Sequence, residues 1–96
     1  MNLRWTPAAA DDLEAINEYL ELRFPQYRQA TIRKLYDAAR ELKRWPYKGR
    51  PATEEGIREI VFTPLPYILV YRVTGLSVEI LRIYHAAQDY RAQDRT

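Results

Sequence analysis

Three short apolar runs in the C-terminal half of this 96-residue chain each deliver an arginine, and the last run ends on the only histidine. The arginines are Arg58, Arg72 and Arg82, and the histidine is His85. Burying an unpaired guanidinium is costly, so a strand whose only role is to pack in a core is not expected to carry arginine. Imidazole titrates near neutral pH and can move a proton. Arginines beside one imidazole therefore predict a site for an anionic ligand.

Tyrosines on the same runs add a second kind of contact. Tyr67 and Tyr71 lie on one run and Tyr84 on the next. Aromatic rings stack on unpaired nucleobases, each stack contributing roughly 1–3 kcal/mol. Tyrosine is also an ordinary strand former, so a structural role is the alternative for each ring. We interpret the two tryptophans, Trp5 and Trp45, as core residues.

Composition restricts the chemistry of such a site. The absence of cysteine excludes disulfides, thiolate catalysis and cysteine-bound zinc. A single histidine excludes a multi-histidine metal site, so we expect no metal and no cofactor. The length predicts one domain over residues 1–96. No leader pattern or spanning apolar run is present, so we expect a cytoplasmic protein without membrane contact.

Charge is unevenly distributed along a chain of net charge +2. Residues 1–22 are mainly acidic, whereas residues 23–50 are mainly basic and rich in arginine. Arginine suits bidentate recognition of carboxylate or phosphate. The alternative is that an acidic helix and a basic helix complement one another as a solvated pair.

The first half of the chain predicts a strand and two helices. Leu3 and Trp5 alternate with polar residues as in a short strand. Thr6 followed by Pro7 is typical of a helix start. Apolar residues then recur at helical spacing on either side of Pro25, at Ala9, Leu13, Ile16 and Leu20 and again at Ile32, Leu35, Ala39 and Leu42. The short link predicts an antiparallel helical hairpin.

The second half predicts a loop over residues 46–56 and then three strands, at residues 57–62, 67–73 and 76–84. An antiparallel meander with the helices on one face, an α+β fold, accommodates this order. Period-two alternation assigns faces. We predict that Ile68, Val70, Leu81, Ile83 and also Arg72 lie on the helix side, and that Tyr67, Tyr71, Arg82 and Tyr84 face a ligand. Sequence leaves the face of Arg58 open.

Motifs over nearly the whole chain resemble the RelE/ParE superfamily of type II toxin–antitoxin toxins. They are Trp5-Thr6-Pro7, Asp11-Asp12-Leu13, Gly49-Arg50-Pro51, Gly56-Ile57-Arg58-Glu59, Tyr71-Arg72 and Ile80-Leu81-Arg82-Ile83-Tyr84-His85. The resemblance implies the RelE/ParE-like fold: an N-terminal strand, an antiparallel helical hairpin and a three-stranded antiparallel meander. It also implies a toxin that inhibits growth and is neutralised by a cognate antitoxin.

Two activities occur in this superfamily. RelE-like members cut mRNA in the ribosomal A site, and ParE-like members inhibit DNA gyrase by binding. The helical hairpin and the Gly49-Arg50-Pro51 loop look more like the ParE branch. The ending after His85, with Tyr90, is similar to RelE-like chains. We hypothesise a metal-independent mRNA endoribonuclease, with gyrase inhibition without catalysis as the alternative. A degenerate toxin that only pairs with its antitoxin is a third option.

RNA cleavage through the ribose 2′-hydroxyl requires a base, an acid and cations. For this chemistry we assign catalytic roles to Arg58 and Arg82 as phosphate-charge stabilisers, His85 as acid or base, and Tyr90 as a residue that positions the hydroxyl. The predicted substrate-binding residues are Tyr67, Tyr71, Tyr84, Lys48 and Arg50. The structural alternatives are a hydrogen-bonded His85 and an ion pair between Arg58 and Glu59.

The resemblance also implies partners. We expect a small, acidic and helical antitoxin with a DNA-binding module, since a basic toxin surface favours an acidic partner segment. Operator DNA would be contacted only through that antitoxin. The target would be ribosome-bound mRNA or DNA gyrase.

Overall fold

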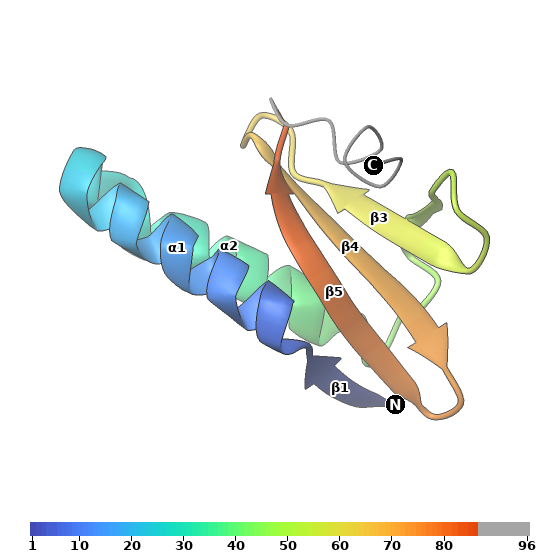
Figure 1. Cartoon of the computed structure of the whole chain (residues 1–96). Coiled ribbons are helices and arrows are strands. Elements are labelled where there is room, and N and C mark those ends of the chain that lie inside the picture. Colours follow the sequence, from blue (N-terminus) through green and yellow to red (C-terminus); the bar gives the residue numbers. More distant parts are fainter. Residues whose placement is uncertain (87–96) are drawn as a thin grey trace.

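The computed structural model describes residues 1–86, which form a five-stranded sheet with a helical hairpin against one face (Figure 1). In chain order the elements are β1 (Asn2–Trp5), α1 (Pro7–Arg23), α2 (Pro25–Glu41), β2 (Arg50–Pro51), β3 (Ile57–Val61), β4 (Tyr67–Thr74) and β5 (Ser77–His85). The strand order is β1-β5-β4-β3-β2, with β1 parallel to β5 and the other neighbours antiparallel. The predicted α+β fold is confirmed, and the short β2 is an addition to it.

Both helices begin at the residues that the sequence indicates. The Thr6 hydroxyl accepts a hydrogen bond from the Ala9 N–H (3.2 Å), and Pro7 follows at the first helical position. α1 ends at Arg23, the N–H of the following Phe24 donates to the Leu20 carbonyl oxygen (2.8 Å), and Pro25 starts α2. Within residues 1–86, neither helix is long and apolar enough to cross a membrane.

The hydrophobic core lies between the helical hairpin and the sheet. Its largest fully buried side chains are Tyr71, Leu35, Leu42, Leu69, Ile80 and Val78. Ala9 and Ala39, both 0% exposed, let the helices approach the sheet closely. Full burial of one leucine or isoleucine contributes about 1.5–3 kcal/mol relative to exposure. This core fixes which face of each strand is left for other roles.

The predicted face assignment of β4 is wrong. Tyr67 and Tyr71 face the helices and are 5% and 0% exposed, whereas Ile68 and Val70 pack on the opposite face with Tyr84. The physical reason is that a tyrosine buries more apolar area than isoleucine or valine when its hydroxyl finds a partner. The Tyr71 hydroxyl has two such partners in the loop after α2.

A bulge in β5 breaks the period-two alternation that the prediction assumed. Val70 lies opposite Arg82, but the next residue, Tyr71, lies opposite Ile80, so Leu81 is the extra residue. Leu81 therefore packs on the same face as Val70, not under the helices as predicted. Ile83 does lie on the helix side.

Two further predictions on burial are corrected by the structure. Trp5 packs against the core as predicted, but Trp45 is 55% exposed. Trp45 follows the last turn of α2, where the chain turns away from the core, so its ring projects from the surface. Arg72 was predicted to lie on the helix side, but it alternates with Tyr71 and so lies on the face opposite the helices. There it pairs with Glu79, which is a structural role.

Arg72 is one of two arginines that hold the buried carboxylate of Glu79. The Arg72 Nε lies 2.7 Å from Glu79 Oε1, and an Arg4 guanidinium nitrogen lies 2.9 Å from Oε2. Glu79 is 6% exposed. The hydrogen bond from Arg72 is the main cause that lowers the pKa of Glu79 below its ordinary 4.5, and burial partly opposes it. The two ion pairs link β1, β5 and β4 across the sheet.

A lowered pKa in the folded state means that ionised Glu79 stabilises the fold above pH 4.5 and that this contribution is lost as pH falls through the lowered value. We expect Glu79→Gln to lower the urea midpoint at pH 7. The gap to the unmodified protein should close progressively as the pH is lowered below 4.5. A gap that stays constant across this range would contradict the assignment.

Candidate functional site

The part of the β5 edge that extends past β1 is the feature around which the candidate site is built. β1 pairs only with Ser77–Ile80, so the remainder of β5 extends beyond it. The Thr6 hydroxyl donates to the carbonyl oxygens of Ile80 (2.9 Å) and Leu81 (3.1 Å). Six residues further along the chain, Asp12 accepts a hydrogen bond from the Ile83 N–H (2.9 Å). The start of α1 therefore takes the place of a longer β1 along this edge.

Arg82 is bound to the same carboxylate. Its Nε and a terminal nitrogen donate to the two oxygens of Asp12 at 2.7 and 3.0 Å, and its guanidinium lies 4.9 Å from the centre of the Tyr84 ring. This two-point pairing is the geometry in which arginine binds a carboxylate most strongly. Arg82 thus joins β5 to α1, and it would have to exchange Asp12 for a phosphate to act as predicted.

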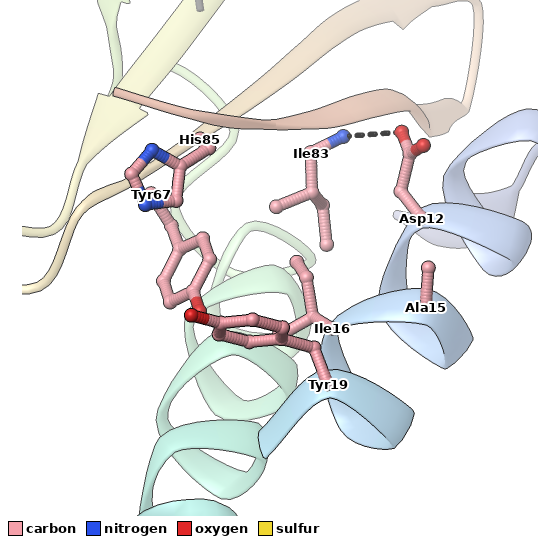
Figure 2. Close-up of a pocket in the computed structure, with 7 residues that line it drawn as sticks. All are labelled: Asp12, Ala15, Ile16, Tyr19, Tyr67, Ile83 and His85. Carbon is pink, nitrogen blue, oxygen red and sulfur yellow. Dashed lines mark hydrogen bonds between the residues drawn. The ribbon is translucent and has the colours of Figure 1, made fainter. Parts of the chain in front are cut away.

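An open hollow of about 420 Å³ lies between α1 and the end of β5 (Figure 2). We call it the α1–β5 hollow, and its lining residues are Asp12, Ala15, Ile16, Tyr19, Tyr67, Ile83 and His85. His85 is exposed at the strand end, and its ring meets Tyr67 edge to face, with centres 5.8 Å apart and an angle of 83°. Among the predicted site residues, His85 and Tyr67 are brought together.

The Tyr67 hydroxyl is not suited to accept a proton. Burial of the ring raises the pKa of Tyr67 above 10.0, and the nearby Tyr19 raises it further. At neutral pH the group is therefore a neutral hydroxyl that can donate or accept a hydrogen bond. Of the side chains that line this hollow, His85 alone carries an imidazole.

Tyr71, predicted to bind substrate, instead fixes the loop between α2 and β2. Its hydroxyl donates to the Pro46 carbonyl oxygen (2.8 Å) and accepts from the Gly49 N–H (2.9 Å). Burial raises the pKa of Tyr71, opposed by that N–H and by the charge of Arg58. A side chain at Gly49 would lie 2.7 Å from the Tyr71 ring, so only glycine fits.

Arg58 holds the same loop from the neighbouring strand. A terminal nitrogen donates to the carbonyl oxygens of Gly49 (2.7 Å) and Tyr47 (3.5 Å), and the guanidinium lies 5.1 Å from the centre of the Tyr47 ring. Glu59 alternates with Arg58 and pairs instead with Arg50, across β3 and β2, at 2.8 Å. The structure thus gives Arg58 a loop-holding role in place of the ion pair considered as its alternative.

The other predicted site residues lie apart from His85. Lys48 pairs with Glu41 at 3.1 Å, and Tyr84 is 7% exposed on the face opposite the helices. Tyr90 lies outside the described residues. Within residues 1–86, no group of three or more histidine, cysteine, aspartate or glutamate side chains is arranged to hold a metal ion.

The predicted catalytic residues that the structure describes do not converge on one point. Arg58 lies opposite Tyr71 and His85 opposite Tyr67, two positions four residues apart on β4. At the usual rise of a strand this separates them by roughly 13 Å along the sheet. Arg82 and His85 are three residues apart on β5, so their side chains leave the strand on opposite faces, and the Arg82 guanidinium is held at the strand edge by Asp12.

Sequence reasoning missed Asp12 and Tyr19 as site residues. Asp12, Ile16 and Tyr19 are spaced by four and three residues, which places them on one face of α1. That spacing was a usable signal for a shared surface. The pairing of Asp12 with Arg82 spans seventy positions and leaves no local mark in the sequence.

Comparison with known proteins identifies the family. Residues 3–90 match the family described as the ParE toxin of the type II toxin–antitoxin system parDE. The chain is 40% identical over 84 residues to the toxin RelE2 of Caulobacter vibrioides, covering 88% of this chain and 93% of that one. It is 34% identical over 88 residues to the Y4kP protein of Sinorhizobium fredii, covering 92% and 91%.

A solved structure gives the same answer for the fold. A chain of the chromosomal ParDE toxin–antitoxin system from P. aeruginosa superposes with a TM-score of 0.80 at 28% identity, covering 88% of this chain and 95% of that one. The chain belongs to the ParE toxin family, within the RelE/ParE superfamily of type II toxins. Membership implies an antitoxin partner.

The Tyr71 hydroxyl is expected to be important for stability. Tyr71→Phe leaves Pro46 and Gly49 without their buried partner, which costs roughly 1–3 kcal/mol in the free energy of unfolding. Urea denaturation measures this loss. Tyr27→Phe is the matched control, because Tyr27 is 60% exposed and its hydroxyl should matter little. Equal effects of the two substitutions would contradict the role assigned to Tyr71.

A double-mutant cycle tests the pairing of Asp12 and Arg82. We expect a coupling energy of about 1 kcal/mol, reduced by added salt because the pair is partly exposed. Asp12→Ala should destabilise more than Arg82→Ala, since it also removes the acceptor of the Ile83 N–H. Additive effects would show that the two side chains do not stabilise the fold as a pair.

Proposed function

We propose that this toxin inhibits growth by binding its target without cleaving RNA, and that the target is DNA gyrase. The observation that carries the proposal is the separation of Arg58, Arg82 and His85 in the folded chain. A metal-independent ribonuclease needs its acid, base and cations within hydrogen-bond reach of one phosphate. The separation of these three side chains therefore supports inhibition by binding.

The contacts of the arginines support the same proposal. Arg82 is bound to both oxygens of Asp12, and Arg58 donates to two loop carbonyls. A guanidinium that stabilises a phosphate must leave these partners first. Their removal would loosen α1 and the loop after α2, so the cations act as parts of the scaffold.

The helical hairpin supplies a surface for a protein target. Its tip projects beyond the sheet (Figure 1). The large apolar side chains exposed there include Tyr19 (52%), Leu22 (83%) and Phe24 (45%). The Tyr19 and Phe24 rings are in contact, with centres 6.3 Å apart. Aromatic side chains grouped in this way are typical of protein interfaces. We assign gyrase binding to this hairpin-tip patch.

Ribosome-dependent mRNA cleavage is the second candidate. His85 at the rim of the α1–β5 hollow, in contact with Tyr67, favours it, because an exposed imidazole can move a proton. The 40% identity to a protein named toxin RelE2 supports it too. For either activity we propose an acidic, helical antitoxin with a DNA-binding module, attracted by the basic segment 23–50.

Brief induction of the chain in bacteria, with cellular mRNA 5′ ends and the SOS response read together, separates the two candidates. We expect SOS induction with intact mRNA, unchanged in His85→Ala and weakened at least several-fold in Leu22→Ala. Co-purification with the antitoxin checks that each variant is folded. Codon-positioned mRNA ends without SOS induction, abolished by His85→Ala, would replace this proposal with the endoribonuclease.

A further inference from the structure

An exposed pair of aromatic rings lies on the turn that follows α2. Trp45 is 55% exposed and Tyr47 is 64% exposed, and Pro46 separates them in the chain. With Glu41 and Lys48, these residues line an open hollow of about 500 Å³. Large rings are normally buried, so two of them on one small turn require an explanation. Neither belongs to the α1–β5 hollow or to the hairpin-tip patch.

Cations surround the two rings. The Arg44 guanidinium lies 5.5 Å from the centre of the Trp45 ring, and Arg58 lies 5.1 Å from that of Tyr47. Lys48 lines the hollow itself. Residues 40–50 contain five basic side chains, Arg40, Lys43, Arg44, Lys48 and Arg50, and one carboxylate, Glu41. Two of these cations have carboxylate partners: Arg50 pairs with Glu59, and Lys48 pairs with Glu41 in an exposed and therefore weak ion pair. The turn thus combines flat apolar surfaces with a net positive charge.

The turn is held rigidly by contacts on both sides. The N–H groups of Arg44 and Trp45 donate to the Glu41 carbonyl oxygen (both 3.0 Å), and the Lys48 N–H donates to the Trp45 carbonyl oxygen (3.1 Å). Beneath it, the Tyr71 hydroxyl holds Pro46 and Gly49. A preformed surface loses little conformational entropy when a ligand binds, which favours a binding function over an incidental exposure.

We propose that this turn, which we call the Trp45–Tyr47 platform, binds single-stranded nucleic acid. An unpaired base stacks on the rings, and the adjoining phosphates contact Arg44 and Lys48. A single strand presents unpaired bases next to phosphate charges. The rings of the platform match the bases, and its cations match the phosphates. An acidic peptide would use the cations but leave the rings without a partner. The proposal holds whether or not the toxin acts on gyrase.

Titration of the purified chain with short oligo-dT and oligo-rU tests this. Trp5→Phe leaves Trp45 as the one tryptophan, because the sequence has two. We expect either oligonucleotide to quench Trp45 fluorescence. The oligonucleotide with the lower Kd shows whether the platform prefers DNA or RNA. Trp45→Ala and Tyr47→Ala should each weaken binding, measured by anisotropy of the labelled strand, about tenfold or more.

Controls separate stacking from simple charge attraction. Tyr27→Ala removes an equally exposed ring elsewhere and should leave the affinity unchanged. Arg44→Gln or Lys48→Gln should weaken binding and reduce the slope of log K against log salt by about 0.7 for each lost phosphate contact. No binding, unchanged affinity after both ring substitutions, or equally tight binding of a duplex or of an oligoglutamate peptide would each overturn the proposal.

Discussion

The fold depends on how the edge of β5 is completed. β1 is four residues long and β5 is nine, so more than half of this edge of β5 extends past its parallel neighbour. Buried or half-buried backbone groups must find partners, and here Thr6 and Asp12 supply them from the first turns of α1. The same two residues fix the direction in which the helical hairpin leaves the sheet. The position of the α1–β5 hollow, with His85 at its rim, follows from this attachment.

The arginines on the sheet have a common explanation in the structure. Arg82 binds Asp12, Arg72 binds Glu79, Arg50 binds Glu59, and Arg58 donates to loop carbonyls. Each joins its strand to another part of the chain. Glu59 and Glu79 are nearly inaccessible to water, so their guanidinium partners are needed to offset the cost of burying a charge. The pattern that suggested an anion site is thus largely the pattern of a charged scaffold.

Local signals predicted the fold well. Thr6 with Pro7 marked the start of α1, and the apolar stripes with Pro25 marked the hairpin, because capping and helical periodicity act over a few residues. The facing of β4 could not be predicted. It depends on a bulge at Leu81 and on the pairing of Tyr71 with a loop more than twenty residues earlier in the chain. Arg82 was recognised on β5, but its partner Asp12 was not, because the two residues are seventy positions apart in the chain.

The central claim is that the toxin acts by stoichiometric binding, with its strand arginines committed to the scaffold. Titration of the purified chain against a fixed amount of DNA gyrase in a supercoiling assay tests this most directly. The account predicts that inhibition saturates when the chain matches the gyrase subunits in number, and that His85→Ala titrates to the same point. The account would be contradicted if gyrase stayed fully active and if, in a translation reaction, fewer copies of the chain than ribosomes were enough to cut the mRNA.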